Sequence, residues 1–118
     1  MKILYLEDHH FFAGEIIEYL KDDLGYEVVY ADSWESVKTI LDSGMKFDFS
    51  ILDVILKNGK TGVQVAQHWE SQLGKIIFLT GCTDDATHKA IEKYSVISKL
   101  NTVWEPLGRF LHGEMVRC

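Results

Sequence analysis

The chain has 118 residues, of which 47% are hydrophobic and 25% are charged, and it contains a single proline. This length predicts one domain over residues 1–118, and the composition excludes a disordered or fibrous protein. The formal net charge of −6 argues against sequence-independent binding to nucleic acids, whose phosphates are also negative. Cys82 and Cys118 form no Cys-x-x-Cys pair, and the apolar run at residues 3–6 is too short for a membrane span. We therefore expect a single cytoplasmic domain with reduced thiols, no zinc site and no effector domain in this chain.

The first two strand–helix units follow directly on each other. Residues 2–6, which include the apolar run at residues 3–6, are typical of a buried strand, and an apolar helix face follows until Gly25. That face consists of Phe12, Ile16, Leu20 and Leu24. Residues 27–31 are predicted as the second strand, and Asp32 with Glu35 resembles a capping box at the start of the next helix. The residues of this helix that we expect to face inward are Trp34, Val37 and Leu41.

Three further units complete the alternation. The strands expected in this part of the chain cover residues 47–52, 76–79 and 96–97. The third helix should end at Gly74 and bury the apolar residues Val65, Ala66, Trp69 and Leu73. Thr83 and the two aspartates after it predict the start of a fourth helix, which should end near Tyr94. A last helix is expected at residues 104–116, with Pro106 in its first turn.

Strands that alternate with helices over short connections predict a parallel sheet with helices on both faces. We expect an α/β fold of the flavodoxin-like, doubly wound type, with five parallel strands in the order 2-1-3-4-5. In such a sheet, ligands bind beyond the carboxyl ends of the strands, where the strand order reverses. The polar residues that should converge there are Glu7, Asp8, Asp53, Thr80 and Lys99.

The chemistry of these residues suits phosphoryl transfer. The carboxylates of Glu7, Asp8 and Asp53 would repel one another unless a cation joined them, and oxygen ligands on a polar loop favour Mg²⁺. Aspartate can act as a nucleophile toward phosphorus, an ammonium group can hold a phosphoryl oxygen, and a hydroxyl can donate to another one. Asp53, Lys99 and Thr80 fit these three roles. The sequence therefore predicts a magnesium-dependent phosphoryl-transfer site.

Four short segments resemble the signature sites of the response-regulator receiver family of two-component signalling. They are Leu6-Glu7-Asp8, Ile51-Leu52-Asp53, Phe78-Leu79-Thr80 and Ile97-Ser98-Lys99. The resemblance implies that Asp53 is the phosphoacceptor and that Asp8 ligates Mg²⁺ directly. It further implies that Glu7 acts on the ion mainly through water and that the backbone carbonyl of Ile55 completes the protein ligands.

The same resemblance implies the partners. The phosphoryl donor would be a phosphohistidine of a sensor histidine kinase or of a histidine phosphotransfer protein that docks beside the first helix. Candidate contacts for this donor are Phe11, Phe12 and Ile16. The chain would then act on a downstream protein as a signalling switch, not as a conventional turnover enzyme. We expect it to be a monomer or a weak homodimer that binds neither nucleic acid nor a membrane.

The sequence also departs from the family pattern. Leu100 replaces the proline that usually follows the family's lysine; since a non-proline cis bond costs about 3–4 kcal/mol, we predict a trans Lys99–Leu100 bond. Val96 stands where a switch aromatic is common, and the segment from Thr80 to the lysine is shorter than usual by about one helical turn. The loop before Gly62 lacks the usual proline and carries one extra residue. These differences keep open a degenerate receiver that serves as a phosphorylation-independent interaction module.

Rival functions fit the sequence less well. A phosphatase-like hydrolase would need a second aspartate two residues after Asp53, where Ile55 stands. A flavin or nucleotide binder of this fold would need a glycine- or hydroxyl-rich loop after the first strand, but that loop is acidic. His9 and His10 could suggest a transition-metal site, but adjacent histidines at a helix start point apart, so we assign them no ligand role.

Overall fold

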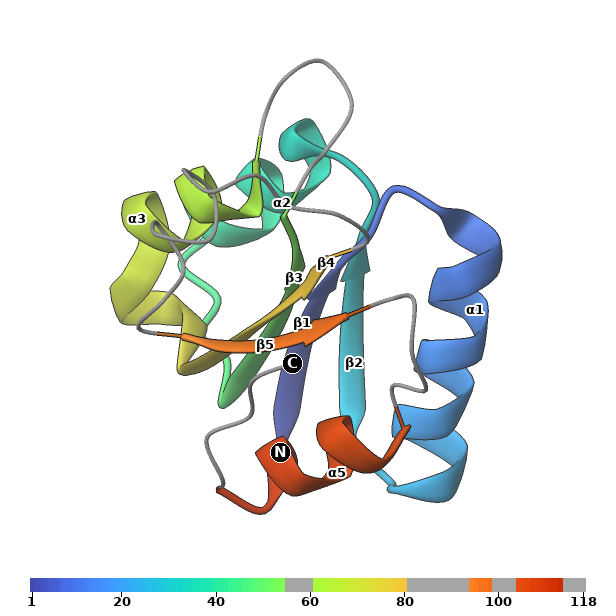
Figure 1. The fold of residues 1–118 in the computed structure, drawn as a ribbon. Coiled ribbons are helices and arrows are strands. Elements are labelled where there is room, and N and C mark those ends of the chain that lie inside the picture. Colours follow the sequence, from blue (N-terminus) through green and yellow to red (C-terminus); the bar gives the residue numbers. More distant parts are fainter. Residues whose placement is uncertain (55–60, 81–93, 99–103, 114–118) are drawn as a thin grey trace.

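A five-stranded parallel sheet forms the centre of the protein (Figure 1). The computed structural model describes residues 1–54, 61–80, 94–98 and 104–113. The strands are β1 (Lys2–Leu6), β2 (Glu27–Ala31), β3 (Phe49–Asp53), β4 (Lys75–Thr80) and β5 (Ser95–Ser98). All neighbouring strands pair in parallel, in the order β2-β1-β3-β4-β5. The predicted flavodoxin-like strand order is confirmed.

Helices cover both faces of the sheet. The described helices are α1 (His10–Glu18), the π-helical turn η1 (Tyr19–Asp23), α2 (Trp34–Asp42), α3 (Gly62–Leu73) and α5 (Trp104–Leu111). Figure 1 shows α1 and α5 on one side of the sheet and α2 and α3 on the other. None of the helices in the described part of the chain is both long enough and apolar enough to cross a membrane. The helix that we expected to begin at Thr83 lies outside the described residues.

Alternation along each strand builds one core on each face of the sheet, because successive strand residues point in opposite directions. Leu4 and Leu6 of β1 belong to the core that α2 and α3 cover. Ile3 and Tyr5, from the same strand, belong to the core that α1 and α5 cover. Both sides of β1 are buried, as expected for a parallel sheet between two helical layers.

The capping box at the start of α2 differs from our prediction. Ser33, not Asp32, is the N-cap: its hydroxyl accepts from the backbone N–H of Ser36 at 3.1 Å, and the Ser36 hydroxyl accepts from the N–H of Ser33 at 3.1 Å. Aspartate and serine both cap helices well, so the sequence alone did not decide between neighbouring positions. The Asp32 carboxylate lies beside His10 instead, with 3.0 Å between Oδ2 and Nε2.

Some element boundaries also differ. The third strand begins at Phe49 rather than residue 47, because the backbone N–H of Phe47 donates to the carbonyl of Gln72 at the end of α3. The first helix does not continue regularly to Leu24, since its end widens into the π-helical turn η1, where the N–H of Leu24 donates to the carbonyl of Tyr19. Apolar spacing carried no sign of this wider turn.

Candidate metal centre

Three acidic side chains lie together beyond the carboxyl ends of β1 and β3. Leu6, the last residue of β1, pairs with Leu52 of β3. Glu7 and Asp8 therefore leave β1 beside Asp53, which ends β3. The register of the two strands brings these carboxyl groups together, although more than forty residues separate them in sequence.

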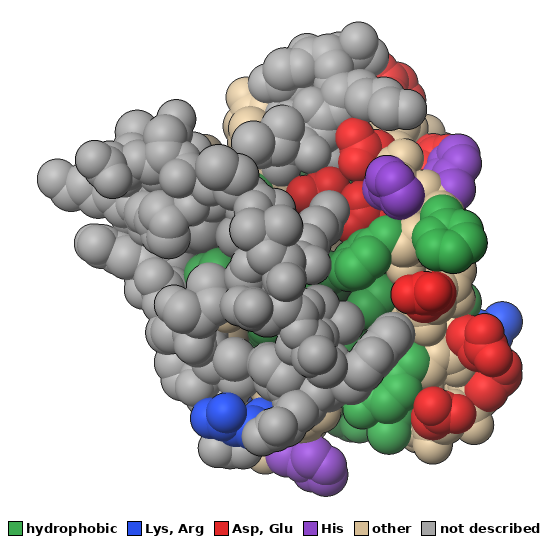
Figure 2. Space-filling model, turned by 45° about the vertical axis from the view of Figure 1, so that its right-hand side comes forward, with side chains coloured by type: hydrophobic (Ala, Val, Ile, Leu, Met, Phe, Trp, Pro, Cys, Tyr) green, Lys and Arg blue, Asp and Glu red, His purple; other side chains and the backbone are tan. Residues whose placement is uncertain are grey.

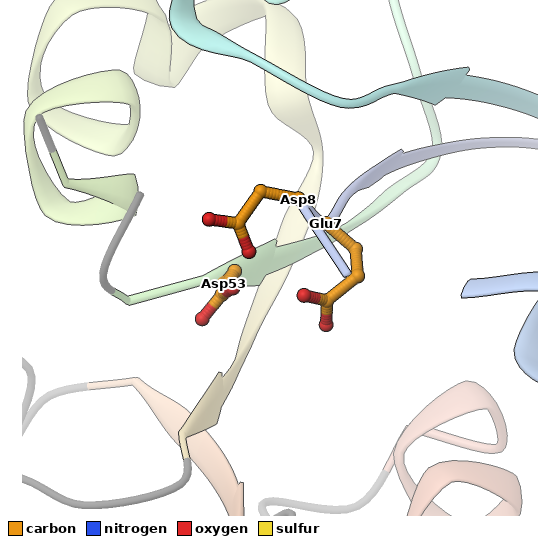
Figure 3. Close-up of side chains that lie close together, drawn as sticks. All are labelled: Glu7, Asp8 and Asp53. Atoms are coloured by element: carbon orange, nitrogen blue, oxygen red, sulfur yellow. The ribbon is translucent and has the colours of Figure 1, made fainter. Parts of the chain in front are cut away.

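The carboxyl groups are close enough to hold one ion. One carboxylate oxygen from each of Glu7, Asp8 and Asp53 lies within 4.8 Å of the other two, and Figure 3 shows the three side chains gathered together. Glu7 is fully buried, Asp53 is 5% exposed and Asp8 is half-buried. Carboxylates that lie this close together and are this well shielded from solvent repel one another unless positive charge compensates them. Because the ligands are hard oxygens, the set fits a divalent cation such as Mg²⁺.

Hydrogen bonds fix the position of Glu7. Its backbone N–H donates to the carbonyl of Ala31 at 3.1 Å, which extends the β1–β2 ladder by one residue. Its carbonyl accepts from the hydroxyl of Tyr30 at 2.6 Å, and its Oε2 accepts from the N–H of His9 at 3.1 Å. The backbone and the carboxylate of Glu7 are therefore both held in place before any ion binds.

Two tyrosines stand beside the acidic group, and our sequence analysis did not include them in the site. The rings of Tyr5 and Tyr30 have centroids 5.9 Å apart. Burial, with added effects of Asp32 and Glu7, raises the pKa of Tyr30 to about 12. Burial, followed by the charge of Glu7, also raises the pKa of Tyr5 well above its ordinary value. Both phenols are therefore protonated at neutral pH, and the only sequence signal for Tyr5 was a polar ring in an otherwise aliphatic buried strand.

The first turn of α3 packs directly against the nucleophile candidate. A Cβ atom added to Gly62 would lie 2.0 Å from the backbone oxygen of Asp53. The N–H of Gly62 donates to the carbonyl of Val54 at 2.9 Å, and the N–H of Val54 donates to the carbonyl of Leu79 at 3.2 Å. Only glycine fits at position 62 without moving α3 or the end of β3. Sequence reasoning had used Gly62 only to measure loop length.

The two histidines have structural contacts at the start of α1. His9 is the N-cap, and its Nδ1 accepts from the N–H of Phe12 at 3.3 Å. His10 contacts Asp32, as given above. Within the described ranges, the group of possible metal ligands around Asp53 consists of the three carboxylates and includes neither ring.

The remaining predicted site residues are only partly described. Thr80 ends β4, where its backbone pairs with Ser98 of β5, but its side chain lies outside what the structure describes. Ile55 and Lys99, with the Lys99–Leu100 bond, also lie outside it. The roles that we assigned to these residues stay predictions.

Comparison with known proteins gives structural matches. No family model and no curated protein sequence matches the chain. The N-terminal domain of a response regulator/sensory box/GGDEF 3-domain protein from Carboxydothermus hydrogenoformans is 27% identical, with a TM-score of 0.73, and the match covers 95% of this chain and 92% of that one. A response regulator from Burkholderia pseudomallei, solved with a phosphorylated aspartic acid, a calcium ion and citrate, is 25% identical, with a TM-score of 0.76 and coverage of 91% and 64%. A two-component response regulator from Clostridium difficile has a TM-score of 0.81 and coverage of 95% and 93%; at 16% identity it shows the fold alone.

Proposed function

We propose that this chain, a receiver domain of two-component response regulators, acts as a cytoplasmic phosphoacceptor switch. Asp53 receives a phosphoryl group from a phosphohistidine, with Mg²⁺ as the cofactor. The donor is a sensor histidine kinase or a histidine phosphotransfer protein. Each chain accepts one phosphoryl group and passes the signal to a downstream protein, so the chain is not a turnover enzyme.

The observation that carries this proposal is the convergence of three carboxylates, one of them at the end of β3. A carboxylate oxygen of Asp53 attacks the phosphorus, and a P–O bond forms as the P–N bond to the donor imidazole breaks. The imidazole keeps the electron pair of that bond and takes up a proton. Bound Mg²⁺ supplies positive charge that stabilises the phosphoryl oxygens and the attacking carboxylate. Asp8 and Asp53 would hold this ion, and Glu7 would act on it mainly through water, as the resemblance to receiver domains implies.

Three further residues complete the proposed site. Asp53 pairs with Leu79 of β4. Thr80 follows Leu79 and ends β4, so it lies next to the proposed nucleophile, Asp53. Lys99 follows the end of the neighbouring strand β5. We assign Thr80 a hydrogen bond to the phosphoryl oxygen, Lys99 an ion pair with it, and the Ile55 carbonyl the last protein ligand of the ion.

The donor is proposed to dock on the exposed face of α1, close to the acidic group. Of the three contacts that the sequence suggested, Phe11 is 78% exposed and Phe12 is half-buried. Ile16 is fully buried in the core and cannot contact a partner, because in a helix it points to the opposite side from Phe11. Figure 2 shows apolar and acidic side chains gathered along this face.

The composition of this face indicates the kind of partner. Phe11, Gly14, Glu15 and Glu18 are exposed at the spacing of one helix face. A glycine inside a helix costs about 1 kcal/mol relative to alanine, and a Cβ at Gly14 would meet nothing within 4 Å. Packing within the described part of the chain therefore does not explain Gly14, whereas close approach of a partner helix does. The matching helix would carry an apolar side chain opposite Phe11 and basic side chains opposite the two glutamates.

The second candidate function is a receiver that binds its partner without phosphorylation. Val96 favours it, because this residue of β5 is aliphatic and 2% exposed. Such a side chain offers no aromatic ring that could change position when the phosphoryl group arrives.

Mg²⁺-dependent labelling with acetyl phosphate tests the proposal. The wild type should gain the mass of one phosphoryl group, and Asp53→Asn should gain none. Asp42→Asn, which removes an exposed carboxylate from α2, should label like the wild type. Absence of labelling in a folded wild type that binds Mg²⁺ would favour the second candidate function. Phe11→Ser should leave labelling by acetyl phosphate unchanged, since so small a donor needs no docking surface, but it should slow transfer from a phosphohistidine protein.

A further inference from the structure

The hydroxyl of Tyr5 is a polar atom that the mechanism above does not use. Tyr5 lies in the middle of β1 with no exposed surface, and its hydroxyl makes no hydrogen bond to any part of the chain that the structure describes. Burying a hydroxyl without a partner costs about 1–3 kcal/mol. Phenylalanine would fill the same space without this cost. The position of the hydroxyl therefore calls for a partner that the described part of the chain does not supply.

The strand register places Tyr5 beside the acidic group. Tyr5 and Glu7 are two residues apart, and the ladder continues through Glu7, so both side chains lie on the same face of the sheet. Tyr5 pairs with Ile51, and Asp53 is two residues beyond Ile51 on the same strand. Tyr5, Glu7 and Asp53 thus share the face that α1 and α5 cover.

We propose that Tyr5 is a positioning residue of the metal centre, whose hydroxyl obtains its missing hydrogen bond from a water that the bound divalent ion carries. Mg²⁺ keeps several waters when only a few carboxylates bind it. Water on a divalent cation is a strong donor, and a phenol oxygen can accept from it. A hydrogen bond to such a water orients the hydration shell and strengthens ion binding. This inference rests on the proposed metal site and adds a residue to it.

Tyr5→Phe separates this role from ordinary packing. The substitution keeps the ring and removes only the hydroxyl. Without Mg²⁺ the variant should unfold at the same temperature as the wild type or at a higher one, because an unsatisfied buried group is removed. With Mg²⁺ it should bind the ion about tenfold more weakly, at the lower end of the ~10–100-fold effect of groups that contact a metal's ligands. A purely structural role would change stability equally with and without the ion.

The experiment titrates Mg²⁺ alone, with no phosphoryl donor, into the wild type, Tyr5→Phe and Tyr26→Phe. Tyr26 precedes β2, at the opposite end of the sheet from the metal centre, so its variant controls for loss of a phenol. Affinity is read by calorimetry, and the tyrosine ultraviolet difference spectrum on ion binding reads the phenol itself. The spectrum should change in the wild type and in Tyr26→Phe, and this change should be smaller in Tyr5→Phe, which keeps only Tyr30 beside the acidic group.

The outcomes distinguish failure of the proposed role of Tyr5 from failure of the proposed metal centre. Equal Mg²⁺ affinity and equal difference spectra in the wild type and Tyr5→Phe would overturn the role of Tyr5 and leave the metal centre in place. A folded wild type that does not bind Mg²⁺ would overturn both. Weaker binding and a smaller spectral change in Tyr5→Phe, but not in Tyr26→Phe, would support the proposal.

Discussion

Gly62→Ala should destabilise the protein and disturb the metal centre together. The added Cβ would lie 2.0 Å from the Asp53 oxygen and 3.0 Å from the Asp53 carbonyl carbon, whereas ordinary contacts begin at about 3.5 Å. Both of these neighbours are backbone atoms, so either α3 or the end of β3 must move. Overpacking of this kind costs about 1–3 kcal/mol, and the bond from the Gly62 N–H to Val54 contributes about 1 kcal/mol more. We expect the free energy of unfolding to fall by about 2–4 kcal/mol.

Urea denaturation measures this change, and Gly14→Ala is the matched control. Position 14 is exposed on α1 with no atom within 4 Å of an added Cβ. The same substitution should therefore raise the free energy of unfolding there, by about 0.5–1 kcal/mol. If Gly62→Ala stayed within about 0.5 kcal/mol of the wild type, the range usual for surface substitutions, the close packing of α3 on Asp53 would be refuted. Because Asp53 is displaced, Mg²⁺ affinity should fall in Gly62→Ala and stay unchanged in Gly14→Ala.

Two further predictions concern titration. The pKa of Tyr30 is raised from 10.0 to about 12. Its contribution to stability is therefore present below its ordinary pKa and is lost as the pH rises through the raised pKa. The stability of Tyr30→Phe should depend less on pH in this alkaline range. At neutral pH the free energy of unfolding of this variant should fall by about 1 kcal/mol, because the hydrogen bond from the Tyr30 hydroxyl to the Glu7 carbonyl is gone. The His10 side chain lowers the pKa of Asp32, so the stability from this pair is present above the ordinary carboxyl pKa and is lost as the pH falls through the lowered one. Carboxyl NMR titration of His10→Ala should show the pKa of Asp32 rising toward its ordinary value, and an unchanged pKa would exclude the pairing.

Much of the fold could be predicted from the spacing of apolar residues and from the residues that end strands and helices. The first two strands were predicted at their observed bounds, because apolar runs such as residues 3–6 end at charged residues. The strand order followed from the alternation of strands and helices. The helix start at Asp32 was wrong by one residue, since neighbouring serine and aspartate cap equally well and only side-chain contacts choose between them. The π-helical turn η1 was not predicted, because it depends on backbone hydrogen bonds that side-chain spacing does not reveal.

The acidic group was predicted because each acid lies at the end of a strand or directly after it, and sequence patterns locate strand ends well. Tyr5 and Gly62 were missed for a different reason. Their importance depends on what lies across the sheet or at the start of α3, and such distances are not encoded by local spacing. Ile16 was assigned to the partner surface in error, since the apolar period of α1 marks the buried face.

Calorimetric titration of Mg²⁺ into the wild type, Asp8→Asn and Asp53→Asn tests the central claim most directly. We predict one ion per wild-type chain and severely weakened binding in either variant, because the two carboxylates hold the same ion. The double variant should then lose little more than the single ones, since residues that act as a unit are not additive. In the absence of Mg²⁺, Asp8→Asn should unfold at a higher temperature than the wild type, because one of three repelling charges is gone. Equal Mg²⁺ affinity in the wild type and in Asp53→Asn would contradict the account.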